Sequence, residues 1–348
     1  MDDYMEYFLK LRKLKYNIPV EVNNARNDFF SYDNKGDYLY IYYDVNTISQ
    51  IANETNELWF KSANAFTDKE EHLGWINKFA CIYMRLDSKN FSRYNDVFKK
   101  IVKNAFDTYD IEKYNRRYYI CCTSYEPDNN LCWNTFMGNS VQHITKINVK
   151  GKCEVSPLSE EDILIIGNDL SCSFEKKYTH GACVCFNKSS LDLGFQYDSN
   201  PLKIIGGFVC YSSNILNSKF EDCLDSVYKL YLEDNNENSV IIKIHEMIDY
   251  CNLFYKNNYY SGEKEFRYVY DSLLENNQEL SILSKEIIKN KIIYKYKFKK
   301  DLIDHITITN SNDKSMFETN FKDKIYLSKI SFNEENINWY DIGLIYED

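Results

Sequence analysis

Two glutamates and one arginine alternate along a short segment and are the residues of this chain best suited to chemistry on a charged intermediate. Positions 263–267 read Glu-Lys-Glu-Phe-Arg, and the β-branched and aromatic residues that follow predict a strand. On a strand, Glu263, Glu265 and Arg267 would share one face, with aromatic packing on the other. Two nearby carboxylates raise the pKa of one of them, and a neighbouring arginine lowers it again.

Carboxylates grouped in this way can orient a ribose hydroxyl or stabilise an oxocarbenium-like centre, as they do in glycosyl transfer. We therefore take Glu265 and Glu263 as candidate catalytic residues, with Arg267 beside them. The same pattern is also typical of an exposed edge strand whose charges prevent aggregation. The residues alone leave both interpretations open.

A second polar cluster spans residues 66–72, where Phe66 is followed by Thr, Asp, Lys, two Glu and His. It follows a predicted strand at Leu58–Phe60. The cluster could line a pocket. It could equally be the first turn of a helix that Thr67 or Asp68 caps, with acidic residues near the positive end of the helix dipole.

A third candidate is the turn-rich segment from Ser124 to Trp133, which leaves a predicted central strand at Tyr118–Thr123. Loops at strand ends often form binding sites. Trp133 could serve as a ligand platform, although a large apolar side chain in this context is also typical of a core.

The motifs of the commonest enzyme classes are absent from the sequence. It contains no P-loop, no dinucleotide-binding glycine fingerprint, no Gly-x-Ser-x-Gly elbow and no His-Glu-x-x-His. These absences exclude typical P-loop ATPases, Rossmann dehydrogenases, α/β-hydrolases and zinc peptidases.

The eleven cysteines do not form a recognisable metal or disulfide pattern, because no Cys-x-x-Cys pair occurs and most of them lie within apolar stretches. Free cysteine behaves there as a small buried apolar residue. His180, Cys183 and Cys185 could be drawn together as ligands, but a fourth ligand is missing from the tetrahedral set. We expect no metal.

The net charge of −10 disfavours general binding to nucleic acid, because an acidic surface repels phosphate. No apolar run is long enough to span a bilayer, and the acidic N-terminus does not resemble a secretory signal. We therefore expect a cytoplasmic protein with no membrane partner.

The predicted elements favour one α+β domain over 1–348, with a mixed or mostly antiparallel central sheet and flanking helices. Residues 1–36 are predicted to form a helical extension and 137–179 an insertion. The further predicted strands are Tyr38–Tyr43, Gly181–Phe186, Ile204–Tyr211, Phe266–Tyr270, Ile303–Thr309, Lys324–Phe332 and Trp339–Ile345. The predicted helices are a short one capped by Asn46 or Thr47, then Ser88–Tyr109, Ser218–Leu232 and Val240–Tyr255.

The order of these segments resembles that of the bacterial family named domain of unknown function 2971. That family combines an aromatic first strand, a Leu-Trp-Phe-Ser strand, an acidic loop, a Cys-containing strand, a Leu-(Met)-Trp helix, a His-x-Gly-x-Cys strand and a late Glu-x-Glu-(Trp or Phe)-Arg strand. The matching segments here, in chain order, are Leu39–Tyr42, Glu57–Ser62, Ala65–Glu71, Ile120–Ser124, Leu131–Trp133, His180–Phe186 and Glu263–Arg267.

The motif order is in turn similar to that of ADP-ribosyltransferases of the His-Tyr-Glu kind, whose split sheet would be compatible with the predicted fold. This resemblance implies NAD as substrate, with Glu265 or Glu263 holding the nicotinamide ribose and aromatic side chains stacking on nicotinamide. The cofactor-binding candidates it indicates are Tyr40, Tyr42, Ser62, Phe66, Tyr125 and Trp133.

The hypothesis from sequence is therefore an NAD-dependent ADP-ribosyltransferase or NAD glycohydrolase that acts on a protein target or partner, as a toxin or a phage-defence effector. The alternatives are a non-catalytic nucleotide sensor on the same fold and a protein-interaction module that acts through its acidic surface. Ile41 stands where the resembling family has a basic residue, which favours the sensor.

Overall fold

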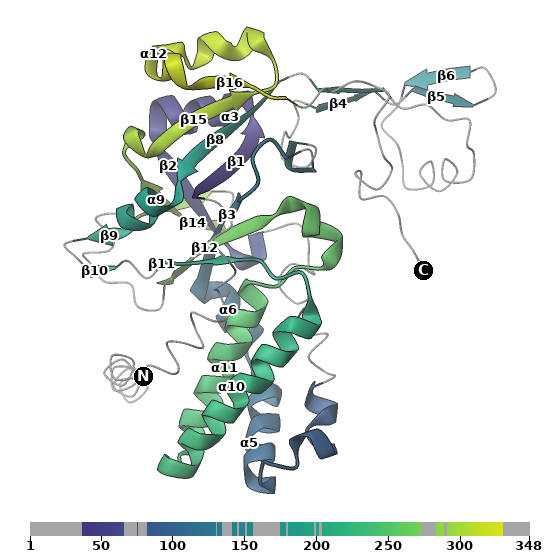
Figure 1. Ribbon diagram of the computed structural model, residues 1–348, viewed down its shortest axis with the longest axis vertical. Coiled ribbons are helices and arrows are strands. Elements are labelled where there is room, and N and C mark those ends of the chain that lie inside the picture. Colours follow the sequence, from purple (N-terminus) through teal and green to yellow (C-terminus); the bar gives the residue numbers. More distant parts are fainter. Residues whose placement is uncertain are drawn as a thin grey trace.

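The computed structural model describes residues 37–65, 75, 82–129, 131–133, 141–144, 146–149, 152–155, 175–178, 180–197, 200–201, 204–272, 283–288 and 291–329. Within these residues the chain is mixed α/β, with a mostly antiparallel, unclosed central sheet and helices (Figure 1). This confirms the predicted combination of helices with a mostly antiparallel sheet. The predicted helical extension over 1–36 and the predicted strand Trp339–Ile345 lie outside the described residues.

The central sheet contains ten strands of the described chain. Neighbouring strands are antiparallel, except that β15 and β16 run parallel. Two strands branch from the main path: β12 (Glu265–Asp271) pairs with β3, and β11 (Ile204–Phe208) pairs with β12. The main path runs β13 (Leu283–Ile288), β14 (Lys291–Lys297), β2 (Glu57–Ser62), β3 (Tyr118–Ser124), β1 (Tyr38–Asp44), β8 (Gly181–Asn187), β15 (Ile303–Ile308) and β16 (Ile325–Leu327).

Strand β3 is the branch point of this sheet. Along one edge it pairs with β12 over its whole length. Its other edge is shared, because β2 pairs with Tyr119 and Ile120 while β1 pairs with Ser124 at the far end. The predicted central position of residues 118–123 is therefore confirmed.

One face of the sheet carries the largest apolar core. Alternate residues of β1 and β8, among them Leu39, Ile41 and Val184, point into it, as the two-residue period of a strand requires. The helices α3 (Val45–Ser49) and α9 (Lys188–Gly194) contact strands on this side. Helix α3 is capped by Asp44, whose carboxylate accepts a hydrogen bond from the Thr47 backbone N–H at 3.0 Å, and not by Asn46 or Thr47 as predicted.

The opposite face of the sheet packs against two helices, one that precedes β3 in the chain and one that follows it. Ile120 and Val269 belong to one apolar cluster with Leu253, the last residue of α11 (Glu237–Leu253), and Tyr114 of α6 (Ile111–Arg117). The same face continues across the sheet to Tyr40, Tyr42, Cys183 and Cys185, which form a smaller cluster with Cys132 and Trp133.

Helices α5 (Asp96–Asp107), α10 (Ser213–Asp234) and α11 pack together at one end of the molecule (Figure 1). They enclose a separate apolar core that includes Phe98 and Phe220. Helix α5 begins later than the predicted Ser88, because the Asn95 side chain accepts a hydrogen bond from the Phe98 N–H at 2.8 Å and so caps it.

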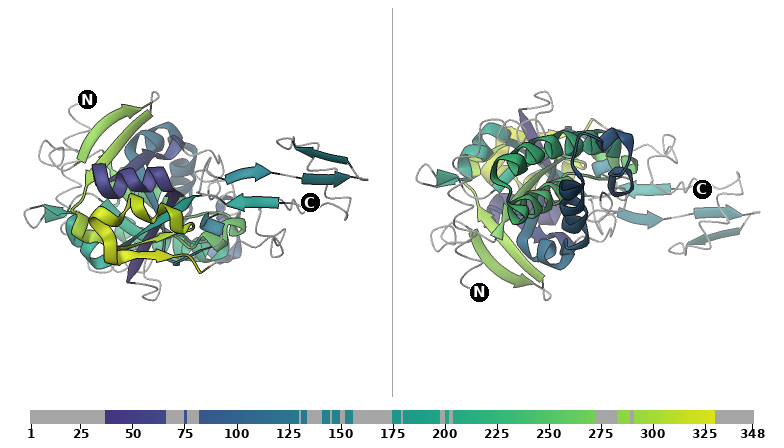
Figure 2. Two further views of the ribbon diagram at one scale, coloured as in Figure 1. Left: turned by 90° about the horizontal axis from the view of Figure 1, so that it is seen from above. Right: turned by 90° about the horizontal axis from the view of Figure 1, so that it is seen from below.

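Four short strands lie within the predicted insertion over 137–179 and outside the central sheet (Figure 2). The strands β4 (Val141–Ile144) and β7 (Glu175–Tyr178) form one antiparallel pair. A second antiparallel pair joins β5 (Lys146–Val149) to β6 (Lys152–Val155). A third two-stranded sheet joins β9 (Gln196–Tyr197) to β10 (Asn200–Pro201).

Gly206 of β11 leaves room for two aromatic rings, and replacing it by valine is expected to destabilise the fold by about 1–3 kcal/mol. A Cβ atom at this position would lie 2.8 Å from Phe266 Cζ and 3.0 Å from Tyr268 Cε1. Urea unfolding monitored by circular dichroism measures the change. The matched control is Ser284→Val on the exposed edge strand β13, for which we expect a change within about 0.5 kcal/mol. Equal effects of the two substitutions would contradict the packing argument.

Candidate functional site

Five polar residues from five neighbouring strands lie in one row across the sheet. Directly opposite residues of antiparallel strands point to the same face, and successive strands are spaced about 4.8 Å apart. The pairing therefore places the Tyr40 and Glu265 backbones roughly 10 Å apart, on either side of Ser124. The cross-strand row, in order, consists of Glu265, Ser124, Tyr40, Cys185 and His305.

Glu265 is the first residue of β12, and its carboxylate lies in the protein interior with 3% of the residue exposed. Arg267, on the same face, donates to both carboxylate oxygens, from Nε to Oε1 at 2.8 Å and from Nη2 to Oε2 at 3.1 Å. Lys256 Nζ lies 3.5 Å from Oε2. Burial by itself would raise the pKa of Glu265, but the charges of Arg267 and Lys256 outweigh burial and lower the pKa to about 2. The carboxylate is therefore ionised at neutral pH.

Glu263 lies near Glu265, but it is positioned by a 3₁₀ segment and not by the predicted strand. The strand begins only at Glu265, because Lys264 adopts a left-handed backbone conformation with φ of 50°, and Glu263 ends a 3₁₀ segment, Asn258–Glu263. The prediction that Glu263 shares the strand face through regular alternation is therefore wrong. Lys256 brings the two carboxylates together instead, since its Nζ donates to Glu263 Oε2 at 2.7 Å.

Lys256, Glu263, Glu265 and Arg267 thus form a buried charge cluster of two cations and two anions. Each residue is at most 6% exposed. Because β12 is paired on both edges, by β3 and β11, the interpretation of this segment as an exposed edge strand is wrong. Its charges are internal, and internal charges are stable only when they are paired and hydrogen-bonded.

The backbone around the cluster is fixed by several side chains. The Ser124 hydroxyl donates to the Glu263 carbonyl at 2.9 Å, and the Cys132 thiol donates to the same oxygen at 3.4 Å. The Glu265 N–H donates to the Tyr211 hydroxyl at 2.8 Å. These bonds hold the 3₁₀ segment against the start of β12, which determines where both carboxylates lie.

Tyr40 and Tyr42 project from the same face of β1, two residues apart. Tyr40 lies directly opposite Cys185 of β8, and burial raises the pKa of Tyr40 above its usual value. The Tyr42 hydroxyl donates to the Glu126 carbonyl at 2.8 Å and accepts from the Asn129 N–H at 3.0 Å. Tyr42 therefore anchors the loop after β3, whereas Tyr40 belongs to the cross-strand row.

The remaining predicted cofactor-binding residues do not join this row. Trp133 is fully buried, and its ring packs edge-on against Tyr42 at 4.8 Å between centroids. Tyr125 packs on Phe208 beside the core of the opposite face. Ser62 lies opposite Tyr119, at the other end of β3 and roughly 16 Å along the strand from Ser124. Phe66 and the acidic cluster up to residue 72 lie outside the described residues.

Two residues at this site, Lys256 and His305, were not predicted from the sequence, and Ser124 was singled out only as the first residue of a turn-rich segment. Lys256 follows α11 and an isolated bridge between Cys210 and Tyr255. Lys256 stands between the apolar residues 253–255 and two asparagines, so its position in the sequence does not indicate burial. Lysine is seldom buried unless it is paired, and only the fold shows which carboxylates Lys256 pairs with.

The histidine considered as a metal ligand with Cys183 and Cys185 lies elsewhere. The His180 ring is hydrogen-bonded through Nδ1 to the buried Asp313 at 2.8 Å. Cys183 is buried in the cluster with Trp133. This particular ligand set is therefore not brought together.

Across the helices of the described chain, none combines the length and the apolar character that crossing a membrane requires. Comparisons with models of protein families, with curated proteins and with solved structures found no match. The resemblance to the bacterial family and to ADP-ribosyltransferases therefore rests on the sequence segments quoted above and stays a prediction.

Proposed function

We propose that this chain binds NAD over the cross-strand row and cleaves the bond between nicotinamide and ribose, as an ADP-ribosyltransferase or an NAD glycohydrolase. The observation that supports the proposal is the placement of Tyr40 and Glu265 on one face, on either side of Ser124. An aromatic ring and an ionised carboxylate at this separation suit the two ends of a nicotinamide riboside. In this proposal the branch of the sheet at β3 would correspond to the split sheet of ADP-ribosyltransferases.

The proposed reaction needs a carboxylate that stays ionised beside a developing positive charge. The bond from nicotinamide N1 to ribose C1′ breaks with its electron pair leaving on nicotinamide. Water or a protein side chain then forms the new bond at C1′ and releases a proton. Glu265 would accept a hydrogen bond from a ribose hydroxyl and stabilise the oxocarbenium ion. Arg267 would keep the carboxylate charged through its two hydrogen bonds.

Access to Glu265 sets a condition on this proposal. The 3% exposure of Glu265 leaves no room for a ribose in the conformation described. The 3₁₀ segment Asn258–Glu263 would have to open, and the 3.5 Å contact of Lys256 with Glu265 would be given up while its 2.7 Å contact with Glu263 remains. We expect NAD to increase hydrogen exchange of this segment, whereas unchanged exchange would contradict the opening.

Ile41 replaces a basic residue of the resembling family, but its side chain lies away from the cross-strand row. Its side chain points into the large core on the other face of the sheet and is 5% exposed. Tyr40, not residue 41, is the β1 residue that shares a face with Glu265. A basic residue at position 41 would not reach the cross-strand row of this chain.

The test is incubation of the full chain with labelled NAD, followed by measurement of free nicotinamide and of label on protein. We expect Glu265→Gln and Tyr40→Leu each to lower turnover, the first by at least about 100-fold. Glu112→Gln, on the exposed surface of α6, is the matched control and should retain full activity. Expression of the active chain should slow bacterial growth, and Glu265→Gln should relieve the effect. Absence of both nicotinamide release and label transfer in the folded wild-type protein would end the proposal.

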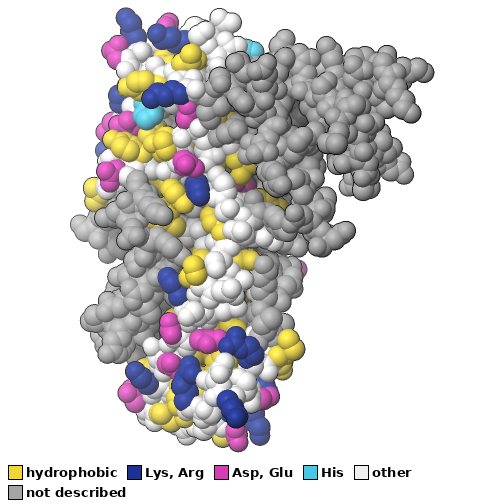
Figure 3. All heavy atoms as spheres, turned by 45° about the vertical axis from the view of Figure 1, so that its right-hand side comes forward, with side chains coloured by type: hydrophobic (Ala, Val, Ile, Leu, Met, Phe, Trp, Pro, Cys, Tyr) yellow, Lys and Arg dark blue, Asp and Glu magenta, His cyan; other side chains and the backbone are white. Residues whose placement is uncertain are grey.

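One observation favours the non-catalytic alternative, a nucleotide sensor on the same fold. Both carboxylates of the buried charge cluster are already engaged by Lys256 and Arg267, an arrangement that also suits a purely structural role. A sensor would show a rise in melting temperature with NAD but no turnover. At the helical end of the face shown in Figure 3, acidic and basic side chains are interspersed, so no single-sign surface there favours the protein-interaction module.

A further inference from the structure

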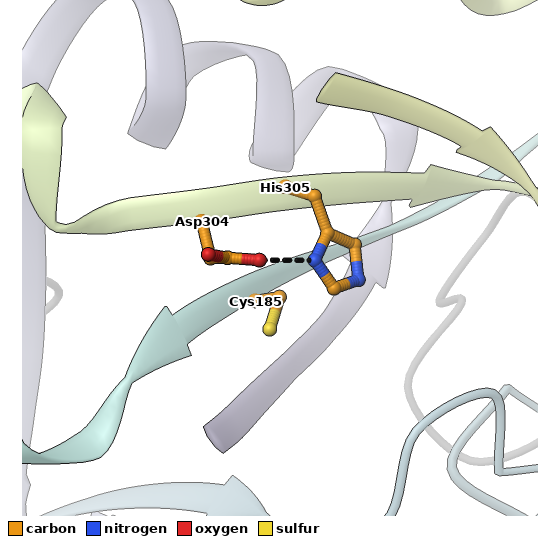
Figure 4. Close-up of side chains that lie close together, drawn as sticks. All are labelled: Cys185, Asp304 and His305. Atoms are coloured by element: carbon orange, nitrogen blue, oxygen red, sulfur yellow. Dashed lines mark hydrogen bonds and ion pairs between the residues drawn. The ribbon is translucent and has the colours of Figure 1, made fainter. Parts of the chain in front are cut away.

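A bulge in β15 places two successive side chains beside a buried cysteine. The register of β15 against β8 shifts between Ile303 and His305, so that Ile303 pairs with Phe186 and His305 pairs with Cys185. Asp304 is the additional residue. In a regular strand Asp304 and His305 would point to opposite faces, but a bulge re-aims side chains and is common next to functional sites. Figure 4 shows Asp304 and His305 of β15 lying beside Cys185 of β8.

The three side chains offer one sulfur, one nitrogen and one oxygen donor, and these atoms all lie within 4.8 Å of one another. Zinc binds this combination of donors, with Zn–S near 2.3 Å and Zn–N and Zn–O near 2.0 Å. The His305 Nδ1 and Asp304 Oδ2 atoms are 2.8 Å apart. Two donor atoms bound to the same tetrahedral zinc ion lie roughly 3.3 Å apart. The Nδ1 and Oδ2 atoms would therefore need to move apart by only about 0.5 Å to hold the ion in place of the hydrogen bond.

The three residues differ in solvent exposure, from a buried thiol to a partly exposed carboxylate, and this gradient gives an ion a path from solvent to the thiol. Cys185 is fully buried. The side chain of His305 is 23% exposed and that of Asp304 is 45% exposed. An ion could therefore enter from solvent past the carboxylate and reach the thiol. The His305 ring lies between Tyr40 and Tyr326, at 6.4 Å and 5.0 Å between centroids, which restricts its orientation.

We propose that Cys185, Asp304 and His305 form a binding site for a divalent transition-metal ion of the zinc class, with the fourth coordination position open to water. Three protein ligands and one exchangeable position are the arrangement of catalytic zinc sites, whereas structural sites use four protein ligands. The proposal replaces the sequence expectation of no metal and does not depend on NAD cleavage.

A cysteine–histidine–aspartate nucleophile would use the same three residues, but the environment of Cys185 argues against it. Burial, with the Asp304 charge as the second cause, raises the pKa of the Cys185 thiol to about 12. Reactive cysteines have lowered pKa values and are partly exposed. A bound cation instead deprotonates a coordinating thiol directly.

The test uses the full chain, stripped of metal with a chelator and titrated with Co²⁺ as a spectroscopic substitute for Zn²⁺. We expect a thiolate-to-cobalt charge-transfer band in the near ultraviolet and d–d bands in the visible, both saturating at one ion per chain. Zn²⁺ should abolish these bands by competition and should raise the melting temperature. Neither readout involves enzymatic activity.

Matched variants assign the ligands. His305→Gln and Cys185→Ser should each remove the charge-transfer band at the same cobalt concentration, and Asp304→Asn should weaken binding at least about tenfold. Cys183→Ser, two residues away on the same strand face, and His180→Asn are the controls and should retain the band. Circular dichroism confirms folding, and His305→Gln at a partly exposed position keeps the test valid if Cys185→Ser unfolds. No saturable band, or a band that persists in folded His305→Gln, would overturn the proposal.

Discussion

Replacing Arg267 by methionine is expected to lower the free energy of unfolding by about 3–5 kcal/mol. Arg267 is 1% exposed and donates to both oxygens of Glu265 and, from Nη1, to the Leu253 carbonyl at 2.7 Å. Methionine fills much of the same volume but donates no hydrogen bond. The substitution therefore leaves a buried carboxylate with only Lys256 as a cation and leaves the carbonyl at the end of α11 without this donor. Urea unfolding at neutral pH measures the change.

The control for this prediction is Arg93→Met, which removes an arginine–carboxylate pair at the surface. Arg93 Nε lies 2.6 Å from Asp225, but the two side chains are 46% and 43% exposed, so we expect a loss of no more than about 1 kcal/mol. The double replacement Arg267→Met with Glu265→Leu should recover part of the stability lost in Arg267→Met, because it also removes the buried carboxylate that has lost its arginine. Equal losses for Arg267→Met and Arg93→Met would contradict the importance of burial.

The wild-type protein is expected to lose stability as the pH rises from about 4 to about 6, because Asp249 loses its proton. Replacing Asp249 by asparagine should abolish this pH dependence. Asp249 lies on α11, where it accepts hydrogen bonds from the hydroxyls of Tyr109 at 2.7 Å and Tyr118 at 2.8 Å. Burial raises the pKa of Asp249 to about 6, although Arg117 and the two tyrosines act in the opposite direction. The ordinary value is 3.8, so the folded protein binds the proton more tightly than the unfolded chain does.

The sign of the effect follows from proton linkage. Between the two pKa values the folded state carries more protons than the unfolded state, so stability falls with rising pH, by roughly 3 kcal/mol in total. The measurement is the difference in unfolding free energy between wild type and Asp249→Asn, taken at intervals from pH 4 to pH 7. Asp87→Asn is the control: a hydrogen bond from Lys103 lowers the pKa of Asp87 below its ordinary value of 3.8, so its pH-dependent effect lies mainly below pH 4 and its difference from wild type should stay nearly constant from pH 4 to pH 7. A difference between wild type and Asp249→Asn that stays constant over this range would contradict the raised pKa.

The segments whose pattern is local were predictable from the sequence. Strands β1, β3, β8 and β12 and helices α10 and α11 lie where aromatic, β-branched or amphipathic patterns predict them. The hairpin of β13 and β14 was missed, since charged residues and one serine interrupt its apolar residues and four of the six β13 residues are exposed. An edge hairpin buries only part of its surface, so its pattern is weak in any window of sequence.

The candidate site was predictable only in part, because the sequence pattern places together only residues that are close in the chain. Residues two apart, such as Glu265 and Arg267, were placed together because their proximity follows from strand geometry alone.

The amino-acid sequence by itself determined which residues are strand or helix formers, and it determined that a carboxylate and a guanidinium would share one face of β12. Tertiary structure alone decided that this face is buried, that Lys256 contacts both carboxylates, and that Tyr40 and Ser124 stand in one row with Glu265. It also decided, through a single-residue bulge, that Asp304 and His305 both reach Cys185. The physical reason is that local patterns record the periods of helix and strand, whereas strand order and register depend on contacts between residues far apart in the chain.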